Sequence, residues 1–219
     1  MKLKTNNNQT IWFTSDTHYN HRNIVSGVSD WENTDRCRQF PTLEAHNEWL
    51  VNEINSKVKE NDILFHLGDW SFGGIEQITI FREAINCKNV HLVLGNHDHH
   101  IKTKLHLQDL FSSVSRILDV IIDKKWKIVM CHFPMRVWED SHKASIMLFG
   151  HTHGTIDKPK DFENPAWISG DFYTHNARTM DVGIDSHPNK TLFSWGEIKS
   201  IMIKKPILLG VDHHNEKTT

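Results

Sequence analysis

The chain has 219 residues and a formal net charge of −2, from 25 basic and 27 acidic side chains, and 38% of its residues are hydrophobic. This composition excludes an intrinsically disordered protein and favours one domain with its own core, which we place at residues 1–219. The near-zero charge disfavours a stable complex with long nucleic acids, whereas 17 histidines, a large number for a rare residue type, indicate imidazole chemistry.

Short apolar runs bounded by polar residues or glycine predict strands. They span residues 11–14, 63–67, 90–94, 117–122, 127–130, 146–149 and 179–184. Apolar residues spaced by three or four from Leu43 to Val58 predict a helix that begins near Pro41 and Thr42, and residues 75–85 and 195–203 predict two more. Helices alternate with strands early in the chain and strands follow one another later, which favours a layered α/β protein with mixed sheets.

Two segments are expected to lack regular structure. Residues 154–178 are polar and contain Pro159 and Pro165, so we expect a long loop or insertion beside the functional site. Residues 212–219 are expected to form a disordered tail.

The cysteines and the N-terminus bear on the cellular compartment. Cys37, Cys87 and Cys131 are odd in number and form no Cys-x-x-Cys pair, which argues against a disulfide framework and against a thiolate zinc site. The first residues lack the apolar stretch of a signal peptide, and no window approaches the ~18 apolar residues of a membrane-spanning helix. We therefore expect a cytoplasmic protein without a membrane partner.

Candidate metal ligands follow five of the predicted strands. The segments are Asp16-Thr17-His18, Gly68-Asp69, Gly95-Asn96-His97-Asp98, Cys131-His132 and Gly150-His151-Thr152-His153. Residues that leave the carboxyl ends of strands in an α/β sheet converge at one crevice, so we expect these segments to meet. Asp and Asn oxygens and His nitrogens suit borderline divalent metals, and two ions about 3.5–4 Å apart form a clamp for phosphoryl chemistry.

The spacing within these segments also matters. Side chains alternate with period two along an extended strand, so Asp16 and His18 should lie on one side, and His151 and His153 likewise. A dinuclear site needs a carboxylate that bridges both ions, and Asp69, alone after its glycine, is the natural candidate.

The ordered set of segments resembles the calcineurin-like metallophosphoesterase superfamily, over residues 16 to about 185. The resemblance implies a four-layer α/β/β/α sandwich of two mixed sheets, with a dinuclear metal centre in a surface crevice. It assigns Asp16, His18, Asp69 and His153 to one metal and Asp69, Asn96, His132 and His151 to the other. It also implies that a hydroxide bridging the metals attacks phosphorus while His97 acts as the acid and Asp98 orients the His97 ring.

Departures within the segments narrow the expected substrate. Protein phosphatases of the superfamily carry Asp-Arg-Gly in the second segment, whereas this chain reads Asp69-Trp70-Ser71, which argues against a phosphoprotein substrate. The extended first segment, residues 16–24, resembles that of small bacterial and phage phosphoesterases. We therefore expect a phosphodiesterase that acts on a nucleotide or another small phosphodiester.

Four residues are candidates for substrate contact: His21, Arg22, Asn96 and His97. A helix start or a surface ion pair would explain His21 and Arg22 equally well. Arg36, Arg38 and Arg136 are weaker candidates. Trp70 and Trp138 could stack on a base, although large aromatic side chains usually belong to the core.

Several alternatives stay open. The same ligands would serve a phosphomonoesterase, a DNA-processing nuclease or a non-catalytic scaffold of the same fold. The nucleases of the superfamily carry a separate DNA-binding cap, for which this chain has no spare segment, and the scaffold proteins lack the third-segment histidine that is present here as His97. The ligand types suit Mn²⁺, our first choice, and also Fe, Ni, Co and Zn. The sequence leaves the oligomeric state open.

Overall fold

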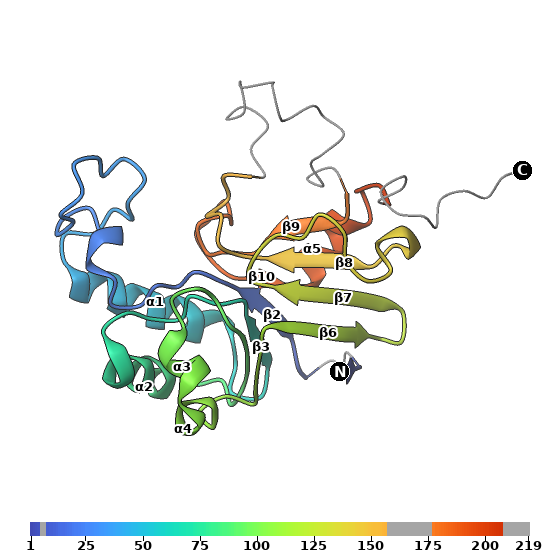
Figure 1. Cartoon of the computed structure of the whole chain (residues 1–219), viewed down its shortest axis with the longest axis horizontal. Coiled ribbons are helices and arrows are strands. Elements are labelled where there is room, and N and C mark those ends of the chain that lie inside the picture. The colour runs from blue at the N-terminus through green and yellow to red at the C-terminus, as the bar shows by residue number, and fades with distance from the viewer. Residues whose placement is uncertain (5–7, 157–176, 208–219) are drawn as a thin grey trace, which may run out of the picture.

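The computed structural model describes residues 1–4, 8–156 and 177–207 (Figure 1). Their strands form two five-stranded sheets. The first sheet has the order β10 (Phe193–Ser194), β2 (Ile11–Thr14), β3 (Ile63–His66), β4 (Asn89–Val93) and β5 (Ser113–Ser115). The second has the order β1 (Lys2–Leu3), β6 (Ile117–Ile122), β7 (Trp126–Cys131), β8 (Ile146–Phe149) and β9 (Thr179–Asp181).

Both sheets mix parallel and antiparallel pairs, which confirms the predicted α/β architecture with two mixed sheets. Strands β2 to β5 are parallel and β10 is antiparallel to β2, with Thr14 opposite His66 in the register of β2 and β3. Strands β7, β8 and β9 are parallel, and β6 is antiparallel to β7. The parallel strands of each sheet therefore end at one edge, where the polar segments that follow them can meet.

Of the described α-helices, α1 (Leu43–Lys57) and α5 (Trp195–Met202) begin at side-chain caps. The others are α2 (Gly74–Ala84), α3 (His99–Thr103) and α4 (Leu105–Gln108), with 3-10 turns η1 (Arg22–Ile24) and η2 (Ser141–Lys143). The Thr42 side chain accepts a hydrogen bond from Ala45 N at the start of α1, and Ser194 and Glu197 form a capping box at the start of α5.

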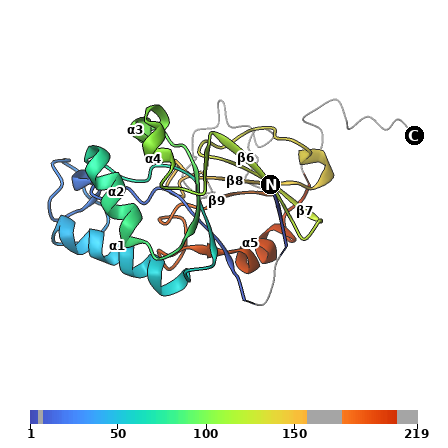
Figure 2. The same cartoon turned by 90° about the horizontal axis from the view of Figure 1, so that it is seen from below.

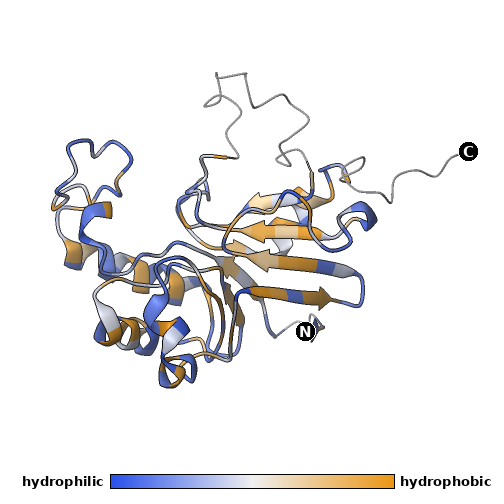
Figure 3. Cartoon of the chain, in the orientation of Figure 1, coloured by the Kyte–Doolittle hydropathy of each residue, from blue (hydrophilic) through white to orange (hydrophobic). Residues whose placement is uncertain are grey.

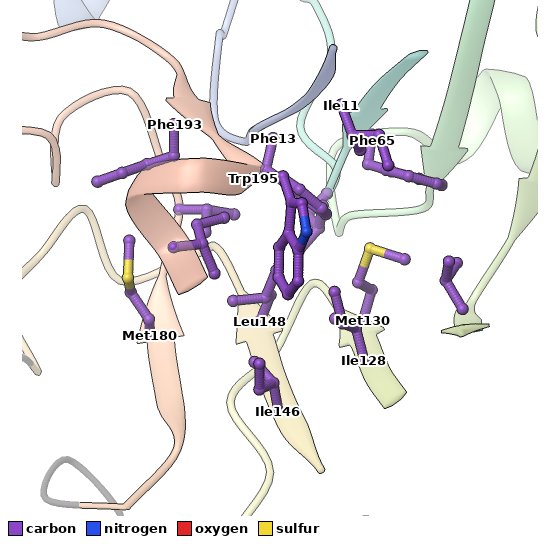
Figure 4. Close-up of a cluster of buried hydrophobic side chains, with 14 of the residues drawn as sticks. Ile11, Phe13, Phe65, Ile128, Met130, Ile146, Leu148, Met180, Phe193 and Trp195 are labelled. Atoms are coloured by element: carbon purple, nitrogen blue, oxygen red, sulfur yellow. The ribbon is translucent and has the colours of Figure 1, made fainter. Parts of the chain in front are cut away.

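Strand alternation divides the buried side chains between two main cores. Phe13, Phe65, Met130 and Leu148 fill the space between the sheets, where Trp195 of α5 joins them (Figure 4). On the outer face of the first sheet, α1 to α4 contribute a second cluster and form a helical layer (Figure 2). The hydropathy colouring shows the apolar residues concentrated in the strands (Figure 3). Trp70 and Trp138 are both buried, which confirms the core interpretation of these side chains.

The structure adds elements that the sequence patterns miss and shortens one. Strands β1, β5 and β10 and helices α3 and α4 are too short to produce a visible periodicity. The predicted strand 179–184 ends at Asp181, since Val182 to Ile184 leave the sheet. Residues 157–176 of the predicted loop and the predicted tail 212–219 lie outside the described residues.

The longest described helix, α1, has 15 residues and carries several charged side chains. Within residues 1–4, 8–156 and 177–207, no helix combines the length and the apolar composition needed to cross a membrane.

Candidate metal centre

The five ligand segments meet at the edge where the parallel strands end. Asp16 N donates to Gly68 O at 2.9 Å and His18 N to Asp69 O at 3.0 Å, which joins the first segment to the second. Between the sheets, His151 N donates to both carboxylate oxygens of Asp16, at 3.1 and 2.9 Å. These contacts confirm that the segments converge as predicted.

One cluster consists of Asp16, His18 and His153, whose ligand atoms all lie within 4.8 Å of one another. The Nε2 atoms of His18 and His153 are 3.2 Å apart, and their rings stack with a 5° interplanar angle. His153 Nε2 is 3.8 Å from Asp16 Oδ1. Two imidazole nitrogens and a buried carboxylate oxygen thus face one point.

A second cluster consists of Asp69, His132 and His151, again with ligand atoms within 4.8 Å. His132 Nε2 is 3.4 Å from Asp69 Oδ2 and 3.0 Å from Asn96 Oδ1. The Asn96 amide oxygen therefore lies where a fourth ligand of this cluster is predicted.

Asp69 lies between the two clusters. Its Oδ2 is 3.8 Å from His18 Nε2 and 3.4 Å from His132 Nε2, while its Oδ1 accepts a hydrogen bond from His97 N at 2.9 Å. This geometry suits the bridging role predicted for the carboxylate.

The charge state of the first cluster fits a cation. Burial and the nearby charges of His153 and Arg38 lower the pKa of His18 well below its ordinary value, so its ring is neutral, as a metal ligand must be. Burial raises the pKa of Asp16 to about 6. Burial lowers the pKa of His153, but the hydrogen bond to Asp185 and the charges of Asp16 and Asp185 outweigh this effect and raise it. A divalent ion would take the place of the His153 proton and compensate the buried Asp16 carboxylate.

The second cluster contains an ion pair in the absence of metal. Burial lowers the pKa of His132, but the hydrogen bond to Asp69 and the charges of Asp16 and Asp69 outweigh this effect and raise it to about 8. Burial raises the pKa of Asp69, yet the contacts with His132 and the His97 backbone lower it overall. A metal ion would replace the His132 proton at this site.

Five predicted ligands have left-handed backbone conformations. The φ angles lie between 47° and 70° for Asp16, His18, Asp69, His151 and His153. Such conformations cost about 1–3 kcal/mol each for residues other than glycine and tend to cluster at functional sites. Asp16 and His18 face the same cluster, whereas His151 and His153 belong to different clusters. None of the four has an extended backbone, so the extended-strand reason given for a shared direction is wrong.

Glycines allow the segments to approach one another closely. A Cβ atom on Gly95 would lie 2.5 Å from Asp69 N, and one on Gly150 would lie 2.6 Å from Asp16 Oδ2. Neither position has space for a side chain, so glycine at both is a packing requirement of the site.

Two ligand histidines are held by hydrogen bonds at their second nitrogen. His132 Nδ1 is 2.7 Å from Leu67 O, and His153 Nδ1 is 2.8 Å from Asp185 Oδ2. Such contacts fix the ring and direct Nε2 toward the metal position. Asp185 itself is missing from the predicted site, although its position shortly after the strand at 179–181 is a signal of the same kind as in the five segments.

Arg38, a weak candidate for substrate contact, has a structural role instead. Its buried guanidinium donates to Asp16 O at 2.5 Å, to Thr17 O at 2.6 Å and to Asp185 Oδ2 at 2.8 Å. Although burial favours the neutral acid, Arg38 and His153 hold the pKa of Asp185 far below its usual range. The pair therefore stays ionised and ties the first segment to His153.

His97 and Asp98 follow Asn96 in the third segment and lie next to the Asp69 backbone or carboxylate. The His97 ring is exposed, and its centroid is 4.6 Å from that of Phe72 and 5.7 Å from that of His18. The buried Asp98 carboxylate accepts from Asp69 N and Gly95 N at 2.8 Å and from Trp70 N at 3.0 Å. These bonds position the second and third segments, whereas the orientation of the His97 ring by Asp98 stays a prediction.

His21 and Arg22 differ in their relation to the site. The His21 ring is 5.7 Å from the His18 ring, and its Nδ1 accepts from Asn23 N as the cap of η1. Arg22 pairs with Asp30 at 3.5 Å, with both side chains more than 60% exposed. His21 therefore remains a candidate for substrate contact, while the surface-pair interpretation fits Arg22.

Comparisons with known proteins agree with this geometry. A crystal structure of a protein of unknown function from Aquifex aeolicus has a TM-score of 0.60, covers 89% of this chain and 100% of its own, and is 20% identical, which shows a shared fold. An uncharacterised protein of Methanocaldococcus jannaschii is 32% identical over 90 residues, which are 40% of this chain and 46% of that protein, so the match spans about half of that relative. The family model described as calcineurin-like phosphoesterase matches residues 9–155, which include all five ligand segments. The chain therefore belongs to the calcineurin-like phosphoesterase family.

Proposed function

We propose that the chain is a phosphodiesterase that hydrolyses a nucleotide or another small phosphodiester with the help of two divalent metal ions. The family and the two ligand clusters support a metal-dependent phosphoesterase. The observation that carries the proposal is the position of the Asp69 carboxylate between both clusters. A carboxylate placed in this way suits a bridge between two ions.

The ligands divide between the ions as the resemblance implies. Asp16, His18, Asp69 and His153 would hold one ion, and Asp69, Asn96, His132 and His151 would hold the other. Their oxygen and nitrogen atoms suit Mn²⁺ as well as Fe, Co, Ni and Zn. When bound, such ions stabilise the negative charge that develops on phosphoryl oxygens.

His97 is the proposed acid. Its backbone is fixed by the hydrogen bond to Asp69, and its exposed ring faces the solvent side of the site. In the reaction a water molecule gives one proton to solvent and its oxygen bonds to phosphorus, the bond from phosphorus to the leaving oxygen breaks, and His97 gives its proton to that oxygen. Solvent then returns a proton to the imidazole.

Two cavities flank the clusters and favour a diester over a monoester. One of about 580 Å³ is lined by His153 among others, and one of about 360 Å³ is lined by Asn96 among others. A phosphodiester carries two organic substituents, one for each side, whereas a monoester carries one. We expect the substrate to occupy both cavities.

The first experiment tests the metal requirement. Protein stripped with a chelator should hydrolyse bis(p-nitrophenyl) phosphate only after Mn²⁺ is restored. With Mn²⁺ present, it should hydrolyse the monoester p-nitrophenyl phosphate more slowly than this diester. Asp69→Asn should lower kcat by about 100-fold or more, because the shared carboxylate charge is lost. Asp30→Asn, which removes an exposed carboxylate, should keep full activity. Protein that binds no metal and hydrolyses neither compound would contradict the proposal and favour a scaffold.

The second measurement separates the role of His97 from metal binding. His97→Ala should slow alkyl diesters by about 100-fold while p-nitrophenyl diesters change little, because a phenolate leaves without a proton. His106→Ala, an exposed histidine of α4, is the matched control. Unchanged turnover of alkyl diesters would refute the acid role. If the wild-type protein hydrolyses monoesters faster than diesters, the result would favour a phosphatase. If it degrades single-stranded DNA, the result would favour a nuclease.

A cytoplasmic location is also part of the proposal. Cys37, Cys87 and Cys131 are free thiols in the structure, and free thiols persist in reducing compartments. Recovery of the protein from an oxidising compartment would contradict this location.

A further inference from the structure

The cavity of about 360 Å³ beside Asn96, here called the Asn96 cavity, has a basic lining that the proposed reaction does not use. His99, Lys102, Arg116 and Phe133 line it together with Asn96. Its volume falls in the range of small-molecule sites.

Arg116 lies next to the second ligand cluster because of the strand register. Ile117 of β6 pairs with Cys131 of β7, so Arg116, one residue before, comes opposite His132, one residue after. On its other side, Leu94 N donates to Ser115 O at 2.8 Å, which places the end of β4 beside Arg116. The Arg116 backbone thus lies between the segments that carry Asn96 and His132, and its side chain is exposed.

Lys102 reaches the same cavity from helix α3. Its backbone N–H donates to Asp98 O at 3.0 Å, so it lies one turn after the third ligand segment. Phe133 forms an apolar wall on the side of the cluster, with its ring centroid 4.7 Å from that of His151 and 5.0 Å from that of His132. The cavity therefore adjoins the proposed reaction site, and Asn96 belongs to both.

The two cations in the Asn96 cavity have no acidic partner among the residues that the structure describes. In the part of the chain that the structure describes, Lys102 and Arg116 form no ion pair, and the cavity lining contains no Asp or Glu. Two like charges at one small cavity repel each other, and an anion bound between them removes that repulsion. Lysine and arginine side chains are also the usual donors to phosphate oxygens.

The larger cavity beside His153 provides a contrast. Its Arg38 is paired with Asp185 at 2.8 Å, and its Lys190 donates to Asp185 O at 2.7 Å. These two cations already have partners within the protein, and the third cation of this cavity, Arg36, shares the lining with the acidic Asp35. The basic groups of the Asn96 cavity, in contrast, remain available to a ligand.

We propose that the Asn96 cavity binds a second phosphate of the substrate through Lys102 and Arg116. The inference rests on the proposed phosphodiesterase activity and narrows its substrate class to phosphodiesters that carry a terminal phosphate monoester on one arm. Such a substrate would place the diester at the ligand clusters and the terminal phosphate between the two basic side chains.

The kinetic test compares adenylyl-adenosine with its 5′-phosphorylated and 3′-phosphorylated forms. The wild-type protein should show a kcat/KM about tenfold or more higher for one phosphorylated form, as expected for charge-assisted hydrogen bonds. Lys102→Met/Arg116→Met should remove this preference while changing kcat/KM for adenylyl-adenosine less than about twofold. Lys57→Met/Lys199→Met makes the same change in net charge at exposed positions away from the cavity and should keep the preference.

A binding measurement keeps this inference separate from the proposed activity. In calorimetry, metal-free wild-type protein should bind adenosine 3′,5′-bisphosphate more tightly than adenosine 5′-monophosphate. Lys102→Met/Arg116→Met should lower the affinity for the bisphosphate by about tenfold. Absence of hydrolysis together with this binding difference would overturn the activity and leave the subsite intact. Hydrolysis without any preference for a terminal phosphate, or a preference that survives in the double variant, would overturn the subsite.

Discussion

At the scale of single residues, the site depends on side chains that contact its ligands at atoms other than those that face the metal positions. Arg38 and Asp185 form a buried pair with both side chains at most 15% exposed, whereas Arg22 and Asp30 form an exposed pair in the same protein. Buried charges require their partners, while exposed pairs contribute little to stability. An ion pair is therefore required for stability at the buried position and contributes little at the exposed one.

We predict that Asp185→Asn weakens both metal binding and folding. The variant loses the charged acceptor of His153 Nδ1 and leaves the Arg38 guanidinium buried without its counter-ion. Mn²⁺ affinity should fall about 10–100-fold, and the free energy of unfolding by about 3 kcal/mol. Isothermal titration and urea denaturation measure these changes. Asp30→Asn should alter either quantity little, and an equal effect of both substitutions would refute the role of the buried pair.

At the scale of elements, the ends of parallel strands determine the site. Glycines precede three ligands at these ends, and at Gly150 the chain of one sheet contacts the Asp16 carboxylate from the other. The contact requires a residue without a side chain. The short turns after the strands are therefore as constrained as the strands themselves.

Gly150→Ala is expected to displace Asp16. The added methyl group would lie 2.6 Å from Asp16 Oδ2 and 2.7 Å from Ser15 Cβ, so backbone must shift to accommodate it. We expect a loss of about 1–3 kcal/mol in stability and a large loss of metal affinity. Gly196→Ala in α5, where the nearest atom is 3.8 Å away, is the control and should be neutral or slightly stabilising. Wild-type metal affinity in Gly150→Ala would show that this close contact is dispensable.

At the scale of the whole molecule, stability should depend on pH through buried neutral histidines. His66 of β3 is fully buried, and burial lowers its pKa to about 3. Its Nδ1 accepts from Gly68 N at 3.3 Å, so its Nε2 carries the proton and donates to Thr17 Oγ1 at 2.9 Å. Thr17 Oγ1 in turn donates to Trp70 O at 2.8 Å, so this chain of hydrogen bonds joins the first ligand segment to the second.

The sign of the pH effect follows from the lowered pKa. Between pH 6.5 and 3 the unfolded state binds a proton at His66 that the folded state does not, so the stabilisation is complete above pH 6.5 and is lost as the pH falls. From pH 7 to pH 5 this residue should contribute a loss of about 2 kcal/mol. In urea denaturation without metal, the free energy of unfolding should therefore fall by about 2 kcal/mol less in His66→Gln than in the wild type between pH 7 and pH 5. If the free energy of unfolding of His66→Gln changes with pH as much as that of the wild type and of the control His106→Gln, His66 is not a source of the pH dependence.

Much of the architecture could be predicted because it is encoded locally. The predicted start of the first helix matches α1 with Thr42 as its cap, and the run 117–122 coincides with β6. Buried strands and amphipathic helices leave periodic patterns over a few residues, and the ligand segments follow directly after the strands. Elements of two or three residues leave no such pattern.

The roles of Arg38 and Asp185 could not be predicted in the same way. They are 147 positions apart in the sequence, and their contact exists only because the two sheets pack together. Arg116 likewise acquires its place beside His132 from the antiparallel register of β6 and β7. Long-range pairs of this kind depend on which faces meet, and no local pattern specifies that.

The sequence by itself determined the chemical types of the ligands, their positions after strands and the mixed α/β architecture, because each depends on a few neighbouring residues. Only the tertiary structure decided that Asp185 holds His153, that five of the ligands adopt left-handed conformations and that Lys102 and Arg116 share one cavity. The physical reason is that these features arise where the two sheets meet, from contacts between segments distant in sequence whose geometry is fixed by packing.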